Sequence, residues 1–324
     1  MEQLQQLSFS LITALQNLSP ALDGVMNMIT FLGRFEFYMV VMTFIYLAYD
    51  RRLGFRLVLL MIVTDFAGMT FKLLFHQPRP YWLRPELEIG KEISYGLPST
   101  HSSSSMAFWG YLAYKVNKTW LWVVACLMIF FIALSRLYLG VHFLHDVLFG
   151  WLIGLVMILL FIACEKPVAS WAAKLSLGMQ ILVGLAASIL VILIVQVVNA
   201  LISGVADPES WRALATEART INFSFSHAGS IFGAVAGYAL MRKVASFSSK
   251  GKWGLRLARF AIGLVGVLVL YFGLDVIFGM IAGDETVLGI VLRIIRYGSV
   301  SFWVIFLAPW LCLKVHLAQI ESLD

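Results

Sequence analysis

Apolar stretches of about 20 residues recur along this 324-residue chain, and they restrict its fold more than any other feature. A helix of that length crosses the hydrocarbon core of a bilayer. Inside a bilayer each backbone polar group needs a partner within the protein, which a helix supplies by itself. The alternating pattern of a membrane β-barrel is not visible in the sequence. We therefore expect an all-α fold, a polytopic transmembrane helical bundle.

The composition supports this expectation, since 60% of the residues are hydrophobic and only 13% are charged. A soluble domain carries roughly twice that charge. We predict about nine spans, at residues 30–49, 53–75, 101–116, 119–135, 143–164, 177–203, 223–241, 258–282 and 287–313. Before them, residues 1–29 carry leucines at helical spacing and are expected to form an amphipathic segment at the membrane interface.

The basic residues predict the orientation. Fourteen of the 24 Lys and Arg residues fall on one side of the predicted spans, and positive charge favours the cytoplasmic side. The N-terminus is then outside and the C-terminus cytoplasmic. The net charge of +6 is thus a topology signal, and no nucleic-acid partner is expected. Short loops and the absence of tails favour a bacterial inner membrane, with the endoplasmic reticulum membrane as the alternative. The sequence does not indicate an oligomeric state.

Three short segments on the predicted external or lumenal side concentrate charged and nucleophilic side chains at the ends of apolar stretches. Charges are costly near a bilayer and persist there mainly for function. The cations Arg79 and Arg136 offer planar forks to phosphate oxygens, and Lys72 adds a point charge. Ser99 and Thr100 precede a predicted helix, whose first amides bind anions. The pattern indicates a phosphate site.

Two histidines and a carboxylate complete the set. His142 and Asp146 are four residues apart, which places them on one face of a helix. The carboxylate can then fix the imidazole tautomer and leave the other ring nitrogen free to attack. His101, on another segment, can protonate a leaving oxygen. The remaining His and Cys residues fit no metal-binding spacing, so no metal or other cofactor is expected.

The three segments together resemble the motifs of the type 2 phosphatidic acid phosphatase superfamily, which read Lys-x6-Arg-Pro, Pro-Ser-Gly-His and Ser-Arg-x5-His-x3-Asp. This chain reads KLLFHQPRP from Lys72, PSTH from Pro98 and SRLYLGVHFLHD from Ser135, with Thr100 in place of the glycine. PSTH is similar to the sphingosine-phosphate phosphatase branch. The resemblance covers about residues 30–164.

The resemblance implies roles for the site residues. His142 would be the nucleophile that forms a phosphohistidine, Asp146 would orient it, and His101 would be the general acid. The phosphoryl group would be bound by Lys72, Arg79, Ser99, Thr100 and Arg136, and the superfamily needs no metal.

The expected organisation has three parts: the N-terminal segment 1–29, a catalytic core of about five spans at 30–164, and a bundle of about four spans at 165–324. The last part contains FSFSHAGS at 223–230, a faint echo of LPSTHSSS at 97–104, which suggests a degenerate repeat with a structural His227. We also expect Asp275 to pair with Arg293 or Arg296, because a charge within a span usually has a partner.

The predicted function is that of an integral membrane phosphatase acting on lipid phosphates or diphosphates at the external or lumenal face. Its partners would be the lipid phosphate substrate and the surrounding membrane lipids. A sphingoid phosphate, phosphatidic acid, a polyprenyl diphosphate and a sugar phosphate all remain open as substrates. Two other functions are alternatives: a phosphotransferase that passes the phosphoryl group to another alcohol, and a transporter or scramblase of phosphorylated compounds.

Overall fold

The computed structural model describes residues 2–244 and 246–320, which form helices joined by short loops. The predicted segments 1–29 and 165–324 also include Met1, Ala245 and residues 321–324, which lie outside the described residues. Within the described part, the extended backbone pairing is a single antiparallel bridge between Phe247 and Ile320. The all-α prediction is confirmed for these residues.

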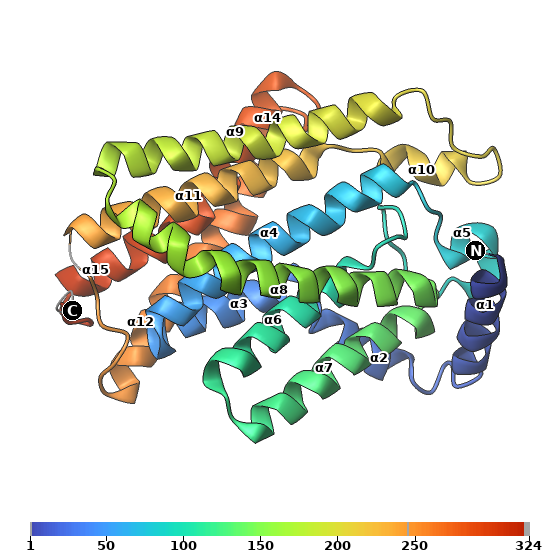
Figure 1. The fold of residues 1–324 in the computed structure, drawn as a ribbon, viewed down its shortest axis with the longest axis horizontal. Helices are drawn as coiled ribbons and strands as arrows, with labels where there is room; N and C mark the ends of the chain where they lie inside the picture. Colours follow the sequence, from blue (N-terminus) through green and yellow to red (C-terminus); the bar gives the residue numbers. More distant parts are fainter. Residues whose placement is uncertain (1, 245, 321–324) are drawn as a thin grey trace. The chain divides into compact units, whose positions relative to one another are not determined.

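The helices follow one another along the chain as drawn in Figure 1. The α-helices are α1 (Glu2–Gln16), α2 (Asp23–Phe31), α3 (Phe35–Phe44), α4 (Arg51–Phe75), α5 (Pro80–Leu83), α6 (Thr100–Val116), α7 (Thr119–Tyr138), α8 (Leu144–Ala173), α9 (Leu177–Ile202), α10 (Arg212–Ala218), α11 (Asn222–Val244), α12 (Trp253–Leu268), α13 (Leu274–Ile281), α14 (Val287–Phe302) and α15 (Ala308–Lys314). Short π-helical segments are η1 (Ile45–Tyr49), η3 (Val269–Gly273) and η4 (Trp303–Leu307), and η2 (Pro85–Leu87) is a 3-10 turn.

Fewer helices than predicted have the length and composition of membrane spans. Six in the described residues do: Arg51–Leu83, Thr119–Tyr138, Leu144–Ala173, Leu177–Ile202, Trp253–Ile281 and Val287–Lys314. A seventh is the pair Asp23–Phe31 and Phe35–Tyr49, which is bent by 50°, if it counts as one span.

The prediction of about nine spans is therefore not confirmed. The difference lies in the stretches predicted at 101–116 and 223–241, which form α6 and α11. Both helices are rich in serine and glycine and bury many of their residues within the protein. A helix packed against other helices need not be apolar all round, so hydropathy alone does not show whether such a helix crosses the membrane.

The described helices form two compact units. Unit 1 comprises Met1–Tyr38, Val63–Ile162 and Val197–Thr220, and unit 2 comprises Met39–Ile62, Ala163–Gln196 and Ile221–Asp324. Each unit has its own buried cluster of hydrophobic side chains.

In unit 1, α6 is held tightly between its neighbours. A two-residue turn joins it to α7, and Asn117 adopts a left-handed backbone there, with φ of 51°. On the other side, α8 approaches through two glycines. A Cβ at Gly150 would lie 2.5 Å from the carbonyl oxygen of Ser99, and one at Gly154 would lie 2.6 Å from that of Ser103. This close packing brings the first turns of α6 and α8 together.

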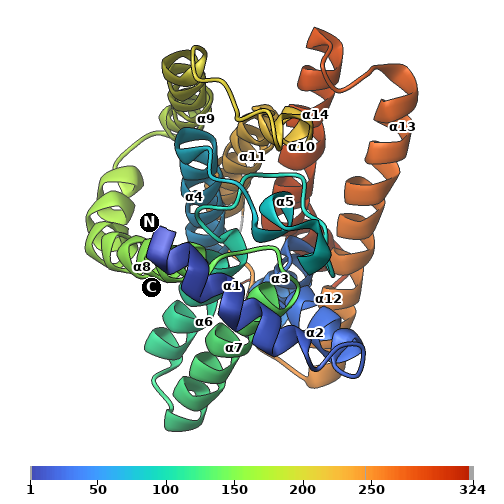
Figure 2. The same ribbon diagram turned by 90° about the vertical axis from the view of Figure 1, so that its right-hand side faces the viewer.

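The N-terminal helices α1 and α2 both pack against α7 in unit 1 (Figure 2). Helix α1 buries Phe9 and Ile12 in a cluster with residues of α7 and the start of α8. The side-chain amide of Gln16 donates to the carbonyl oxygens of Leu87 and Tyr138, at 3.0 and 2.9 Å. Leu4 and Leu7 on α1 are exposed, as an amphipathic helix requires, and its interfacial location stays a prediction.

In unit 2, α11 and α14 pack backbone against backbone. A Cβ at Gly229 would lie 2.3 Å from the carbonyl oxygen of Ile294, and one at Gly233 would lie 2.1 Å from that of Gly298. Glycines four residues apart on one helix face allow this approach, which is a common way for membrane helices to associate.

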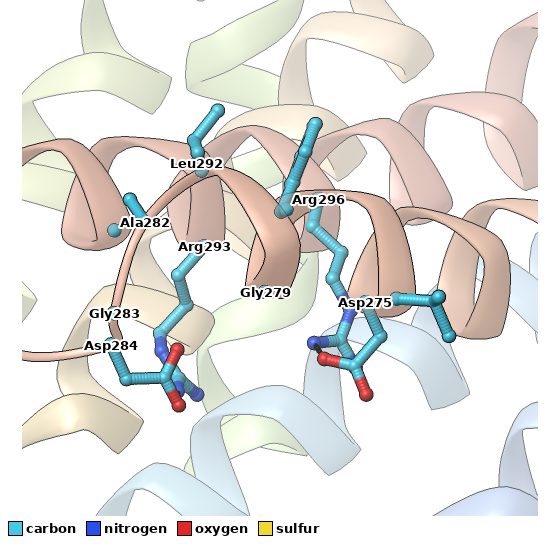
Figure 3. Close-up of a pocket in the computed structure, with 11 residues that line it drawn as sticks. Asp275, Gly279, Ala282, Gly283, Asp284, Leu292, Arg293 and Arg296 are labelled. Atoms are coloured by element: carbon cyan, nitrogen blue, oxygen red, sulfur yellow. Dashed lines mark hydrogen bonds and ion pairs between the residues drawn. The ribbon is translucent and has the colours of Figure 1, made fainter.

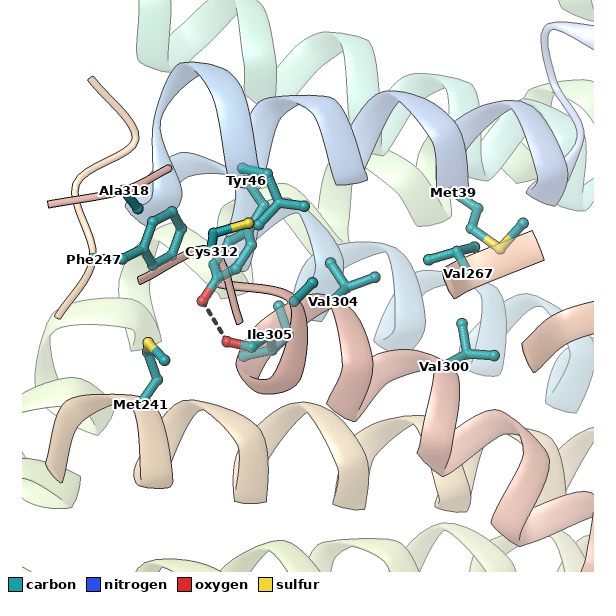
Figure 4. Packing of buried hydrophobic residues seen from close by; sticks show 12 residues of the cluster. Met39, Tyr46, Met241, Phe247, Val267, Val300, Val304, Ile305, Cys312 and Ala318 are labelled. Atoms are coloured by element: carbon teal, nitrogen blue, oxygen red, sulfur yellow. Dashed lines mark hydrogen bonds between the residues drawn. The ribbon is translucent and has the colours of Figure 1, made fainter. Parts of the chain in front are cut away.

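The core of unit 2 gathers side chains from segments far apart in the sequence (Figure 4). Within it the Tyr46 hydroxyl donates to the carbonyl oxygen of Ile305 at 2.8 Å, so the buried hydroxyl is satisfied. Nearby Arg259, only 1% exposed, donates to the carbonyl oxygens of Leu47, Ser249, Lys250 and Leu317. Arg259, one of the fourteen basic residues predicted to face the cytoplasm, therefore ties η1 and two loops to α12.

Candidate active site

The eight predicted site residues all lie in unit 1, at the ends of its helices. Lys72 is in the last turn of α4, and Arg79 precedes α5. Ser99, Thr100 and His101 begin α6, Arg136 is in the last turn of α7, and His142 and Asp146 flank the start of α8. Lys72, Arg79, Arg136, His142 and Asp146 are each at most 2% exposed. Five ionisable groups therefore share one buried cluster.

Lys72 and Arg79 are fixed by carbonyl groups of the loop before α6. The Lys72 ammonium donates to the carbonyl oxygens of Tyr95 and Gly96, at 2.5 and 3.2 Å. Arg79 donates through Nε to the Ser94 carbonyl at 2.5 Å and through its second terminal nitrogen to Tyr95 at 3.1 Å. The acceptors of these bonds are neutral carbonyls and not carboxylates, so the bonds themselves do not cancel the charge of either cation.

The loop that holds these cations is itself anchored by the segment before α11. The Tyr95 hydroxyl donates to both carboxylate oxygens of Asp207, at 3.0 and 3.1 Å. Asp207 in turn accepts from Nε of Arg219 at 2.6 Å. Burial, and then the hydrogen bond to Asp207, raise the pKa of Tyr95. Trp211 packs against the Tyr95 ring and closes this anchor.

Arg136 has a carboxylate partner that the sequence did not indicate. Its guanidinium forms an ion pair with Glu92 and donates to the Thr30 hydroxyl at 2.5 Å, while its Nε is buried without an acceptor. Burial would raise the pKa of Glu92, but Arg136 and then Arg79 outweigh this effect and hold the pKa below its ordinary value. Glu92 is thus an ionised group that occupies part of the Arg136 fork.

His142 is poised between a cation and a carboxylate. Its Nε2 lies 3.2 Å from a terminal nitrogen of Arg79, and its Nδ1 lies 3.2 Å from Oδ2 of Asp146. A guanidinium can only donate, so Nε2 must be the unprotonated nitrogen and Nδ1 must carry the proton. Burial, and then the positive charges of Arg79 and Lys72, lower the pKa of His142 well below its ordinary value. The ring is therefore neutral, and its lone pair at Nε2 accepts from Arg79.

The pairing of His142 with Asp146 differs in detail from the prediction. His142 lies in the turn before α8 and not within the helix. Asp146 reaches back from the first turn and also accepts from the backbone N–H of Phe143 at 2.9 Å. The Asp146 carboxylate thus both caps the start of α8 and orients the imidazole of His142.

His101 belongs to the same cluster. Burial, and then the positive charge of Arg136, lower the pKa of His101 well below its ordinary value, although Glu92 opposes this shift. A Cβ at Gly33 would lie 2.9 Å from the His101 ring, so the absence of a side chain there makes room for it. The Nε2 atom of His101 is buried and has no hydrogen-bond partner among the described residues. It is a free position for a substrate oxygen.

The start of α6 shows how the chain accommodates Thr100. Ser99 caps the helix by accepting from the backbone N–H of Ser102 at 3.3 Å, and its own N–H donates to the Asp146 carbonyl at 3.0 Å. A Cβ at Gly68 would lie 2.9 Å from the methyl group of Thr100. The methyl group therefore points toward α4, into space that a glycine leaves open.

Two other histidines, His145 and His227, lie in different surroundings. His145 stacks on Phe143, with Nε2 at 3.3 Å from Oδ1 of Asp146 but without hydrogen-bond geometry. His227 belongs to unit 2, where its Nδ1 lies 2.6 Å from the carbonyl oxygen of Phe223. Across residues 2–244 and 246–320, no three His, Cys, Asp or Glu side chains converge as a metal site requires.

Several residues of the site and its supports could not be identified from the sequence. Glu92, Tyr95 and Asp207 fit no motif, and a lone acidic or aromatic residue in a loop carries little signal. By contrast, the predicted pairing of Asp275 with an arginine is confirmed, since Arg296 forms an ion pair with it. Arg293 pairs with Asp284 instead, at 2.6 Å.

Comparisons with known proteins match both halves of the chain. Residues 53–168 match the PAP2 superfamily, and residues 225–320 match the family described as PAP2 superfamily phosphatase, transmembrane extension. Mouse sphingosine-1-phosphate phosphatase 2 is 31% identical over 137 residues, which cover 40% of this chain and 38% of the relative. Rat glucose-6-phosphatase 3 is 29% identical over 173 residues, which cover 44% of this chain and 49% of the relative.

The matched region thus spans less than half the length of these two curated relatives. A solved structure, a transmembrane PAP2 type phosphatidylglycerolphosphate phosphatase from Bacillus subtilis, is 23% identical. Its match covers 52% of this chain and 88% of the solved chain, with a TM-score of 0.45.

Proposed function

Because this chain belongs to the PAP2 superfamily, we propose that it is an integral membrane phosphatase that hydrolyses lipid phosphates or diphosphates at the external or lumenal face. The reaction proceeds through a phosphohistidine and uses no metal. The observation that carries this proposal is the setting of His142: its Nδ1 faces Asp146, its Nε2 faces Arg79, and two further buried cations share the cluster.

The first step is capture of the phosphoryl group. Its oxygens accept from Arg79, from the unpartnered Nε of Arg136 and from Lys72, and the first backbone amides of α6 add further donors. When a phosphoryl oxygen takes the N–H that Arg79 directs at His142, Nε2 of the histidine is released. Substrate binding thus activates the nucleophile.

The second step transfers the phosphoryl group. Nε2 of His142 attacks phosphorus, an N–P bond forms, and the P–O bond to the leaving group breaks. His101, which becomes protonated when the phosphate places negative charge beside it, gives that proton to the departing oxygen, and Asp146 stabilises the positive charge that develops on the His142 ring. Water then attacks the phosphohistidine and gives a proton back to His101. The N–P bond breaks, and inorganic phosphate leaves.

The position of the site favours a lipid substrate. Arg136 lies in the last turn of one candidate span and Asp146 in the first turn of another, and Lys72 lies in the last turn of α4, which belongs to a third. The site therefore lies at the membrane–water boundary, where lipid phosphates reside. The similarity to a sphingosine-1-phosphate phosphatase supports a long-chain phosphate, whereas the glucose-6-phosphatase relative supports a sugar phosphate as the competing substrate.

We also propose an orientation in the membrane and a cellular location for the chain. With α6 and α11 counted as spans, the positive-inside rule favours a site opposite the cytoplasm and an N-terminus outside, and a bacterial inner membrane suits the short loops. Removing the buried Arg259 from the cytoplasmic set leaves thirteen basic residues, so the bias persists. Residues 30–164 form the proposed catalytic core, to which the segment around Asp207 contributes the anchor described above.

A substrate panel tests the proposal. The purified chain is given a sphingoid phosphate, phosphatidic acid, a polyprenyl diphosphate and glucose 6-phosphate with a chelator present, and phosphate release is measured. We expect phosphate release from at least one lipid phosphate. His142→Ala should lower the rate of release at least about 1,000-fold. The control His316→Ala, which removes an exposed histidine, should not lower it. Full activity of His142→Ala, or complete inhibition by the chelator, would refute the mechanism.

The fate of labelled phosphate separates hydrolysis from transfer. With a radiolabelled substrate whose leaving group needs no protonation, quenching of His101→Ala with alkaline SDS should leave a base-stable, acid-labile label on the protein, since slow hydrolysis lets the phosphohistidine accumulate. In the wild type the label should appear as inorganic phosphate. A label that appears instead on an added alcohol would identify a phosphotransferase.

A further inference from the structure

A charged cavity in unit 2 is lined by residues that take no part in the proposed catalysis. It has a volume of about 370 Å³ and lies between α13, the loop that follows it and α14 (Figure 3). Small residues, among them Gly279 and Ala282, leave the space open on the side of α13. Arg293 and Arg296 extend into it from α14.

The two arginines form one surface because they are three residues apart on a helix. Each has a carboxylate partner: Asp284 lies 2.6 Å from Arg293, and Asp275 forms an ion pair with Arg296. The cations are the deeper members, with side chains 17% and 11% exposed against 69% and 58% for the aspartates. The cavity therefore has a positive interior and a negative rim.

The positive interior has unused hydrogen-bonding capacity. The Nε atoms of both arginines are buried and have no acceptor in the part of the chain that the structure describes. The Arg296 guanidinium is also held over the ring of Tyr271, with 4.9 Å to the ring centroid. Buried donors without acceptors cost free energy, and phosphate oxygens are acceptors that suit arginine.

The cavity lies where a lipid headgroup could reach it. It adjoins the loop between the candidate spans Trp253–Ile281 and Val287–Lys314, so it opens near one end of both. Asp275 lies six residues inside the first span, a rise of about 9 Å. Val276 and Leu292 add apolar walls beside the charges. A ligand with a charged head and apolar chains fits these surroundings.

We propose that this cavity binds the headgroup of an amine-bearing, zwitterionic phospholipid. The phosphate accepts from Arg293 and Arg296, and the ammonium group lies against the rim carboxylates of Asp275 and Asp284. The net charge of the four side chains is zero, which suits a zwitterion, whereas a purely anionic headgroup must compete with both aspartates. The site is independent of the proposed hydrolysis and binds a lipid that the enzyme does not turn over.

Lipid binding to the purified full chain tests this proposal. The protein in detergent is titrated with phosphatidylethanolamine, phosphatidylglycerol or phosphatidylcholine, and bound lipid is counted by native mass spectrometry. We expect phosphatidylethanolamine to bind at least tenfold more tightly than phosphatidylglycerol. Arg293→Gln should weaken the binding of phosphatidylethanolamine at least tenfold. The control Arg52→Gln, an exposed arginine in the same unit, should bind as the wild type does.

A second variant protects the test against simple misfolding. Asp275→Asn keeps the side-chain shape and removes one rim charge, so it should reverse the preference toward phosphatidylglycerol. If the ion pairs only hold α13 and α14 together, both variants should lower the melting temperature without changing lipid preference, and the proposal fails. Equal binding of all three lipids by the wild type, or a preference for phosphatidylglycerol, also overturns it. Competition by O-phosphoethanolamine but not by inorganic phosphate would support recognition of the headgroup, and equal competition would refute it.

Discussion

Removing the carboxylate of Asp207 should impair catalysis although this residue does not belong to the proposed catalytic set. Asp207 accepts the Tyr95 hydroxyl, and the Tyr95 carbonyl accepts from both Lys72 and Arg79. Asp207→Ala leaves the buried Tyr95 hydroxyl without its acceptor and Arg219 without its ion pair. The loop that holds the two phosphate-binding cations is then free to move.

The size of the effect follows from these contacts. A hydrogen bond to a charged group contributes about 1.5–3 kcal/mol. If the whole of this energy positions the cations for the transition state, kcat/KM should fall about 10- to 150-fold. The Asp207–Arg219 ion pair adds less, since the Arg219 side chain is 30% exposed and water screens it. Asp207→Asn retains one acceptor for Tyr95 and should cost less than Asp207→Ala.

The assay compares three variants by phosphate release on the best substrate of the panel. Tyr95→Phe removes only the hydroxyl, so it should reproduce most of the loss seen with Asp207→Ala, and the double variant should be little worse than either. Arg212→Gln is the control, because this exposed side chain donates to the backbone carbonyl of Asp207 and its removal leaves the Asp207 carboxylate in place. Additive losses in the double variant, or unchanged kcat/KM in Tyr95→Phe, would refute the proposed linkage.

Further predictions follow from individual contacts. Because the pKa of His142 is lowered and the nucleophile must be unprotonated, the acidic limb of kcat/KM should lie below about pH 6.5, and a limb above that value in a pH profile contradicts the assignment. Glu92→Gln should strengthen inhibition by inorganic phosphate about tenfold, measured as an inhibition constant, since the anion no longer competes with a carboxylate. Gly68→Ala should lower the free energy of unfolding by about 1–3 kcal/mol through a clash with Thr100, and adding Thr100→Ser should restore it. Arg259→Gln should cost about 3 kcal/mol in unfolding by SDS, with kcat/KM of the remaining folded protein unchanged.

The contacts of the site differ in how far the sequence could predict them. His142 and Asp146 are four residues apart, so local geometry alone brings them together, even though His142 lies before the helix and not in it. Lys72, Arg79 and Arg136 were recognisable because charge is rare in apolar sequence and therefore conspicuous. The contact of Arg79 with His142 joins residues 63 positions apart and depends on how the helices pack.

The span count shows the limit of hydropathy. Helices α6 and α11 form where spans were predicted, yet their serines and glycines face other helices. Glycines make the close contacts of α8 with α6 and of α11 with α14, and hydropathy does not indicate such contacts. Hydropathy measures transfer to lipid and not to the interior of a bundle, so it does not decide whether such a helix crosses.

By itself, the sequence determined an all-helical membrane protein with a cluster of cations, histidines and a carboxylate at helix ends, because these features depend on hydrophobicity and on short spacings along the chain. Only the tertiary structure decided which nitrogen of His142 carries the proton and that Glu92 forms an ion pair with Arg136. It also decided that Asp207 anchors the loop that holds Lys72 and Arg79. Each of these depends on side chains from distant segments meeting in a buried space, where hydrogen-bonding partners are set by packing and not by sequence distance.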